Sequence, residues 1–161
     1  MVGGHFSLAE NIQAATKIVE ETLERLGANR VAVSSSDIVA TIIEPIASTH
    51  FIEHVTAKDL FDCDLGITSA QWAIAETGTL VLESDKENSR LTSLVPTVHL
   101  CILKAGRIRQ TLGEILELTQ PELSRTMTFS TGAPRTSDIE LTLAIGVHGP
   151  KELHVIVIND Q

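Results

Sequence analysis

The sequence predicts an α/β protein of three layers built around a mainly parallel sheet. Strand-like and helix-like segments alternate along much of the chain, which is the order of β-α-β units. The strand-like segments 80–82, 98–103 and 153–158 are apolar almost throughout, rather than at alternate positions. Continuous apolar runs of this length are typical of strands that are covered on both faces. Together these observations favour a sheet enclosed between two outer layers.

The first elements follow from capping and spacing signals. Ser7 and Glu10 form an S-x-x-E capping box, which predicts a helix start. Apolar residues then recur at helical spacing, and Gly27 supplies the stop: Leu8, Ile12, Ala15, Val19, Leu23 and Leu26. A strand is expected at 30–33 and a second helix at 38–43, which Pro45 ends. The polar turn between them, 34–37, is interpreted as an ordinary N-cap in preference to an anion cradle.

A further helix is predicted over 107–118, because Ile108, Leu112, Ile115 and Leu116 lie on one stripe. Ligands of parallel α/β sheets usually bind at the carboxyl ends of the strands. The segments of most interest are therefore the loop after residue 33 and the loops around Gly66, Gly132 and Gly149.

Composition narrows the class of protein. A chain of 161 residues with 43% hydrophobic and 20% charged residues suits one globular domain, 1–161. A net charge of -9 disfavours partners such as nucleic acid or an anionic membrane. Neither a membrane-spanning apolar run nor a secretory signal is apparent, so a cytoplasmic protein with reduced Cys63 and Cys101 is expected.

Several chemical motifs are rejected or missing. His50, Glu53 and His54 match H-x-x-E-H, an inverted zinc-protease pattern, but no helix cap precedes them, and no metal site is expected. The two cysteines form no C-x-x-C pair, which disfavours a zinc ribbon or an iron–sulfur cluster in this chain. The sequence has no P-loop, no G-x-G-x-x-G dinucleotide motif and no G-x-S-x-G hydrolase elbow.

Two polar stretches are richer in chemistry-bearing residues than core packing requires. The first runs over 64–82, and the second over 130–140 together with 146–150. Taken singly, Asp64 and Asp138 are interpreted as caps and the glycines as turn residues. Taken together, the two stretches indicate a site.

These stretches resemble the LUD (lactate utilisation) domain family, in particular its lactate-utilisation protein C branch. The resemblance covers roughly residues 30–160, and residues 1–29 form an N-terminal helical segment. It rests on motifs that occur in the family's order: GITSA at 66–70, AIAETGTLVL at 73–82, Arg90, SLVP at 93–96, His99, TGAPRTSDIE at 131–140, GVHGP at 146–150 and LHV at 153–155.

The resemblance implies a fold akin to the NagB/RpiA/CoA-transferase-like domains. It also implies a cluster-free subunit of a cytoplasmic complex that oxidises L-lactate to pyruvate. The iron–sulfur clusters would then belong to partner subunits, and this chain would bind no cofactor of its own.

A site hypothesis follows from the residue types. Arg90 and Arg135 are expected to hold a carboxylate or phosphate, aided by backbone N–H groups near Gly78 and Gly132. Glu76 is the candidate general base or nucleophile, since the related CoA-transferase fold uses a glutamate near a strand edge, and His148 is a second acid/base candidate. The remaining candidate anion-binding residues are Thr77, Thr79, Gly66, Thr68 and Asp138. The alternative, in which Glu76 only caps and Arg135 pairs with Asp138 or Glu140, stays open.

Two other functions are also left open by the residues. One is a free-standing enzyme or binding protein for an anionic small molecule, such as a CoA ester, sugar phosphate or folate. The other is a scaffold with a vestigial pocket. A homo-oligomer is a further possibility.

Overall fold

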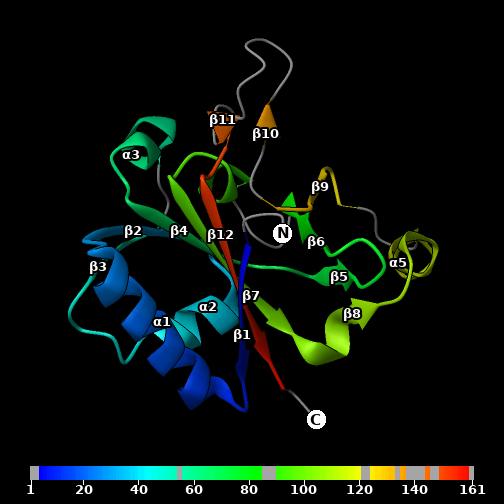
Figure 1. The fold of residues 1–161 in the computed structure, drawn as a ribbon, viewed down its shortest axis with the longest axis horizontal. Coiled ribbons are helices and arrows are strands. Elements are labelled where there is room, and N and C mark those ends of the chain that lie inside the picture. Colours follow the sequence, from blue (N-terminus) through cyan, green and yellow to red (C-terminus); the bar gives the residue numbers. More distant parts are fainter. Residues whose placement is uncertain are drawn as a thin grey trace.

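The computed structural model describes residues 4–53, 56–84, 90–120, 124–132, 135–136, 144–145 and 149–159. Its centre is a six-stranded sheet in which every pair of neighbouring strands is parallel (Figure 1). In spatial order the strands are β1 (Gly4–Ala9), β12 (Glu152–Ile158), β7 (Val98–Lys104), β4 (Leu65–Ser69), β2 (Arg30–Val33) and β3 (His50–Ile52). The α/β class with a mainly parallel sheet is therefore confirmed.

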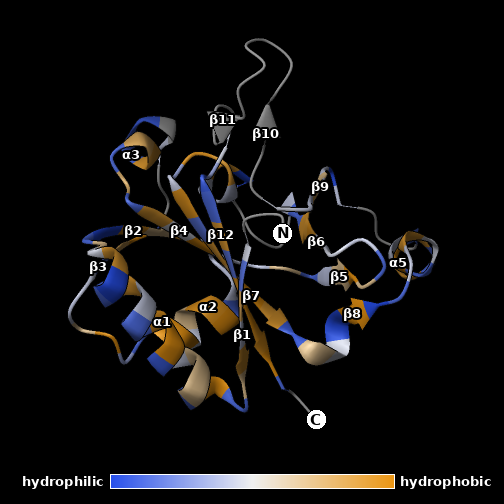
Figure 2. Ribbon diagram, in the orientation of Figure 1, coloured by the Kyte–Doolittle hydropathy of each residue, from blue (hydrophilic) through white to orange (hydrophobic). Residues whose placement is uncertain are grey.

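Helices α1 (Ile12–Leu26) and α2 (Asp37–Ile43) cover one face of this sheet. Both turn hydrophobic residues toward the strands, as Figure 2 shows. The largest apolar cluster lies between them and the sheet, and it includes Val19, Ile42, Ile67, Leu100 and Ile156. Burial of these side chains fixes the two helices against the strands.

A second, smaller sheet covers the opposite face. Its strands lie in the order β8 (Ile108–Arg109), β5 (Trp72–Ile74), β6 (Thr79–Glu83) and β9 (Met127–Ser130). Leu80 and Leu82 of β6 pack against Cys101, Leu103 and Val157 of the large sheet. The outer side of the small sheet packs against Ile115 of α5 (Leu112–Thr119). The layer on this face is therefore a mixed sheet with a helix outside it.

The predicted start of the first helix is wrong. Ser7 lies in β1, a strand whose six residues pair in parallel with β12. The helix begins at Ile12, and the Asn11 side chain caps it by accepting a hydrogen bond from the Ala14 N–H at 2.9 Å. Pairing with a strand about 150 residues away overrides the local capping pattern. The predicted end is confirmed, since Gly27 adopts a left-handed conformation with φ of 61°.

The helix predicted over 107–118 begins later than expected. Residues 105–107 form a short 3₁₀ helix, η2 (Ala105–Arg107), and Ile108 belongs to β8. Thr111 caps α5 by accepting a hydrogen bond from the Glu114 N–H at 3.4 Å. Pairing of β8 with β5 accounts for the apolar Ile108, which mimicked the first position of a helical stripe.

The remaining elements are α3 (Ala57–Phe61), η1 (Arg90–Ser93) and the antiparallel pair β10 (Arg135–Thr136) and β11 (Ala144–Ile145). The strand predicted at 30–33 and the helix predicted at 38–43 are confirmed as β2 and α2. Cys63 and Cys101 are both buried and outside any disulfide, and burial raises the pKa of the Cys63 thiol. Among the described residues, no helix has the length and apolar character needed to cross a bilayer.

Candidate functional site

A cleft of about 450 Å³ opens at the carboxyl ends of β2, β4 and β7. Strands β2 and β4 are neighbours in the sheet. The chain leaving β2 leads to β3 at one edge of the sheet, and the chain leaving β4 leads to β7 on the other side, so the two connections diverge. Such a divergence leaves a crevice at the strand ends, where open α/β sheets bind their ligands. The cleft is lined by Ser35, Ser36, Asp37, Ile38, Ser69, Ala70, Gln71, Trp72, Ile102, Lys104 and Arg107.

The floor of the cleft carries hydroxyl groups from two strand ends. Ser36 occupies the N-cap position of α2, as predicted, but its side chain makes no capping hydrogen bond. Its hydroxyl lies 2.9 Å from the Ser69 hydroxyl instead. Hydroxyls can donate or accept, so this pair can adapt to a polar ligand.

Two cationic side chains, Lys104 and Arg107, border the same cleft. The Arg107 guanidinium carbon lies 4.9 Å from the ring centroid of Trp72, in a cation–π contact. Trp72 is held in turn by a hydrogen bond from its ring N–H to Oε1 of the buried Glu83 at 3.2 Å. Asp37 adds one negative charge to the lining, so the cleft carries a local excess of positive charge in a chain of net charge -9.

The structure places Gly66 and Thr68 inside the fold, on β4, away from this cleft. A Cβ at Gly66 would overlap the backbone carbonyl of Thr92 in η1, so close packing of main chains requires glycine there. The fully buried Thr68 hydroxyl lies 2.8 Å from Nε2 of His99. Burial lowers the pKa of His99 to about 4, so its ring is neutral at pH 7.

Glu76, Thr77 and Gly78 form the exposed turn between β5 and β6. The Glu76 N–H donates to the carbonyl of Gln110 at 3.2 Å, and Gly78 has φ of 64°. Glu76 does not line the cleft at the strand ends. The turn interpretation of Gly78 is confirmed, because a left-handed φ of this size favours glycine.

The two polar stretches do meet, through hydroxyl groups. The Thr79 hydroxyl lies 2.7 Å from that of Thr77 and 2.9 Å from that of Thr131. Thr77, Gly78, Thr79 and Gly132 line a groove of about 480 Å³ between β1 and the small sheet. This groove is mainly apolar, with Phe6, Leu103 and Val157 among its other walls.

The other predicted residues are more scattered. Arg90 is exposed on η1. Gly132 also borders a small cavity of about 170 Å³ that reaches His99 and Ser93. For Arg135 only the backbone is described, in β10, and Asp138 and His148 lie outside the described residues. Asp64 caps no described helix: its Oδ2 accepts from the N–H groups of Asn29 and Arg30 at 2.9 and 3.0 Å, at the start of β2, so its role is structural but the cap prediction is wrong.

Lys104 and Arg107 were missed from the sequence. The strand-end rule points to the loop after residue 33, which reaches the cleft at Ser35. The loop expected around Gly66 is wrong, because Gly66 lies within β4, and only the last residue of that strand, Ser69, lines the cleft. The rule was not applied to the strand at 98–103, which Lys104 follows directly. A cation immediately after a buried strand was the available signal.

Comparison with known protein families identifies the family of this chain. The sequence profile of the LUD domain matches residues 2–158. This chain belongs to the LUD domain family. Over 103 residues this LUD domain is 38% identical to lactate utilization protein C of Deinococcus radiodurans, a match that covers 62% of this chain and 49% of that protein. An uncharacterized protein of Neisseria meningitidis is 32% identical over 148 residues, which cover 90% of this chain and 64% of the relative.

Lactate utilization protein C of Bacillus subtilis is 31% identical over 110 residues, covering 65% of this LUD domain and 46% of that protein. The chain thus spans about half to two thirds of the length of these curated relatives. Among solved structures, the crystal structure of a DUF162 family protein from Deinococcus radiodurans superposes with a TM-score of 0.75. That match has 24% identity and covers 98% of this chain and 89% of the other, which shows a shared fold.

Proposed function

We propose that this LUD domain acts in bacterial lactate utilisation as the cluster-free, cytoplasmic subunit of an L-lactate-oxidising complex, and that it binds an anionic small molecule at the carboxyl edge of its sheet. Family membership and relatives named lactate utilization protein C support the pathway. The observation that carries the ligand class is the cleft itself, in which Lys104 and Arg107 lie beside the hydroxyls of Ser36 and Ser69.

The chemistry of the lining suits a carboxylate. The planar guanidinium of Arg107 can donate two parallel hydrogen bonds to one carboxylate, and Lys104 adds a compact charge. The Ser36 and Ser69 hydroxyls can satisfy further oxygen atoms, such as the 2-hydroxyl of lactate. Trp72 lines one side of the cleft.

The NagB/RpiA/CoA-transferase-like relationship fits the arrangement of the cleft, because a ligand at the strand ends of a parallel sheet is what that class of fold favours. In this proposal redox chemistry is left to iron–sulfur partner subunits. Cys63, between α3 and β4, and Cys101, in β7, are both buried, so neither offers an exposed thiolate to a cluster.

Trp72 provides the test of ligand binding, since it is the only tryptophan and lines the cleft. Titration with L-lactate or pyruvate is expected to change its fluorescence. Lys104→Ala should weaken that binding about tenfold, the usual cost of losing one charge-assisted contact. Lys17→Ala is the matched control, because Lys17 is an exposed lysine on α1 that pairs with Glu21. Equal affinities for Lys104→Ala and wild type would show that the anion does not bind in this cleft.

Glu76 and His148 remain proposed acid/base residues; because Glu76 lies outside the cleft, its role would be in turnover by the assembled complex and not on the anion held in the cleft. Glu76→Gln is expected to abolish growth on L-lactate without changing the unfolding free energy, because the side chain is exposed. Anion binding reported by Trp72 should persist in this variant. Normal growth of a Glu76→Gln strain on L-lactate would show that Glu76 takes no part in turnover.

Assembly is tested by co-expression with candidate iron–sulfur partner subunits. We expect stoichiometric co-purification, and lactate oxidation only in the assembled state.

A free-standing enzyme is the second candidate function. The volume of about 450 Å³, ample for more than a three-carbon acid, favours it, since a CoA ester, sugar phosphate or folate would use that space. Turnover of such a compound by the isolated chain would support this alternative and contradict the subunit.

A further inference from the structure

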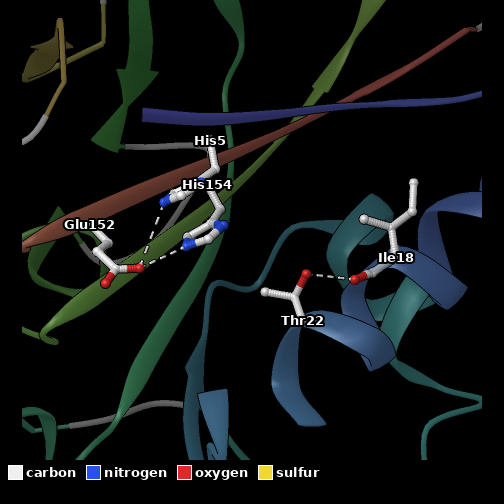
Figure 3. A network of polar contacts seen from close by, with 5 residues as sticks. All are labelled: His5, Ile18, Thr22, Glu152 and His154. Atoms are coloured by element: carbon white, nitrogen blue, oxygen red, sulfur yellow. Dashed lines mark hydrogen bonds and ion pairs between the residues drawn. The ribbon is translucent and has the colours of Figure 1, made fainter. Parts of the chain in front are cut away.

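Two histidines and a carboxylate converge at the amino end of the β1–β12 pair, at the opposite edge of the sheet from the cleft. His5 lies on β1, and Glu152 and His154 lie on β12. The parallel register places His5 directly beside His154. Figure 3 shows the two rings side by side, with their nitrogen atoms directed at the Glu152 carboxylate.

The donor atoms have the spacing of a metal site. Oε2 of Glu152 lies 3.2 Å from Nε2 of His154 and 3.9 Å from Nε2 of His5, and all three atoms lie within 4.8 Å of one another. Ligand atoms around a tetrahedral zinc ion, with bonds of about 2.0–2.2 Å, are separated by roughly 3.3–3.5 Å. Small side-chain movements therefore suffice to bring all three into coordination distance.

We propose that His5, Glu152 and His154 form a binding site for a first-row divalent metal ion of the zinc type. Two imidazoles with one carboxylate favour such an ion over magnesium or calcium, which prefer oxygen ligands. Three protein ligands leave a fourth position for water or an external ligand. This site is independent of the function proposed above, because none of its residues lines the cleft.

The two histidines differ in how firmly the surrounding protein holds them. The His154 side chain is only 7% exposed, whereas that of His5 is 58% exposed on the edge strand. The two rings stack, with centroids 4.4 Å apart and planes inclined by 11°. The lone pair of an imidazole nitrogen lies in its ring plane, and one metal ion cannot lie in two separate, nearly parallel planes, so coordination requires one ring to turn. The exposed His5 ring is the one with room to do so.

Binding at this position would tie β1 to β12 through side chains as well as through the backbone. Because β1 is an edge strand, held within the sheet on one side only, the metal would add stability where the sheet is least supported. Sequence patterns could not indicate the site, since His5 and Glu152 are far apart along the chain.

The test uses chelator-treated chain without a polyhistidine tag, titrated with zinc chloride in a calorimeter. Wild type is expected to bind one zinc ion per chain with micromolar or tighter affinity. His5→Ala should weaken binding at least about tenfold. Because His5 is exposed on an edge strand, the substitution should leave folding intact, and loss of binding there reports on coordination. Glu152→Gln is a second variant with the same expectation.

His50→Ala is the matched control, because His50 is exposed on the opposite edge strand and belongs to the rejected H-x-x-E-H pattern. It should bind zinc like wild type. Zinc should also shift the ring resonances of His5 and His154 in nuclear magnetic resonance spectra. The proposal is overturned if wild type binds no zinc at about 100 µM, if His5→Ala binds like wild type, or if His50→Ala loses the site.

Discussion

Gly66 lies within β4, where the main chain of η1 passes close against it. A Cβ at this position would overlap the Thr92 carbonyl and approach Cγ of Pro96 to 3.1 Å. We predict that Gly66→Ala lowers the free energy of unfolding by about 2–4 kcal/mol, because backbone segments must separate to admit the methyl group. Urea denaturation followed by circular dichroism measures this change.

Gly113→Ala is the control for that substitution. A Cβ at Gly113 meets only the Thr111 side-chain oxygen, at an ordinary 3.8 Å, and the residue lies in α5. Alanine should leave stability unchanged or raise it by up to about 1 kcal/mol through helix propensity. If the two variants were equally stable, close packing would not be the reason for glycine at position 66.

His99 connects the residue scale to the pH dependence of the whole chain. It is buried beside Thr68, and its pKa is lowered by burial to about 4. The unfolded chain takes up a proton near the ordinary histidine value of 6.5, whereas the folded chain does so only near 4. Between these values the unfolded state binds more protons, so stability falls as the pH falls.

We predict that wild type loses about 2 kcal/mol of unfolding free energy through this residue between pH 7 and about pH 4.5. His99→Gln should abolish that part of the loss, since glutamine stays neutral and can still bond to Thr68. Denaturant titrations at both pH values provide the measurement, and His50→Gln, at an exposed position, serves as the control. Identical pH profiles for wild type and His99→Gln would contradict the assignment.

At the scale of elements, α1 shows how a local signal can be displaced. Ser7 and Asn11 both have side chains that can cap a helix, and in the structure Asn11 is the cap. Asn11→Ala is predicted to cost about 1 kcal/mol of stability, because the Ala14 N–H loses its acceptor. Ser7→Ala should change stability by less than about 0.5 kcal/mol, since Ser7 lies in β1. Thermal unfolding of both variants tests the assignment, and a larger loss for Ser7→Ala would reverse it.

The small sheet shows that a local pattern can also mislead about the direction of a strand. The apolar segment 80–82 is a buried strand, as its composition predicted, but its partners β5 and β9 are antiparallel. Burial on both faces, by the large sheet and by α5, gives it the continuous apolar pattern of a parallel strand. Apolar composition therefore reports how a strand is covered, and leaves its direction undetermined.

At the scale of the whole molecule, the two candidate sites lie at opposite ends of the strands of one sheet. The cleft lies where parallel strands end and their connections diverge, and the His5–Glu152–His154 cluster lies where β1 and β12 begin. The strand-end rule predicted the region of the cleft from the loop after residue 33, whereas Gly66 lies within β4 and does not line the cleft. It could not rank the side chains there, because whether Arg107 or Arg90 reaches the cleft depends on where η2 and η1 lie in the fold.

By itself the sequence determined the α/β class, the positions of β2, α2, β7 and β12, and membership of the LUD family. These follow from short-range periodicity, turn residues and motif order, all of which are carried by neighbouring residues. Only the tertiary structure decided that β1 is a strand, that the layer opposite α1 and α2 is a sheet, and that Lys104 and Arg107 face the hydroxyls of Ser36 and Ser69. Each of these depends on pairing or packing between segments far apart in the chain, and local patterns carry no record of such partners.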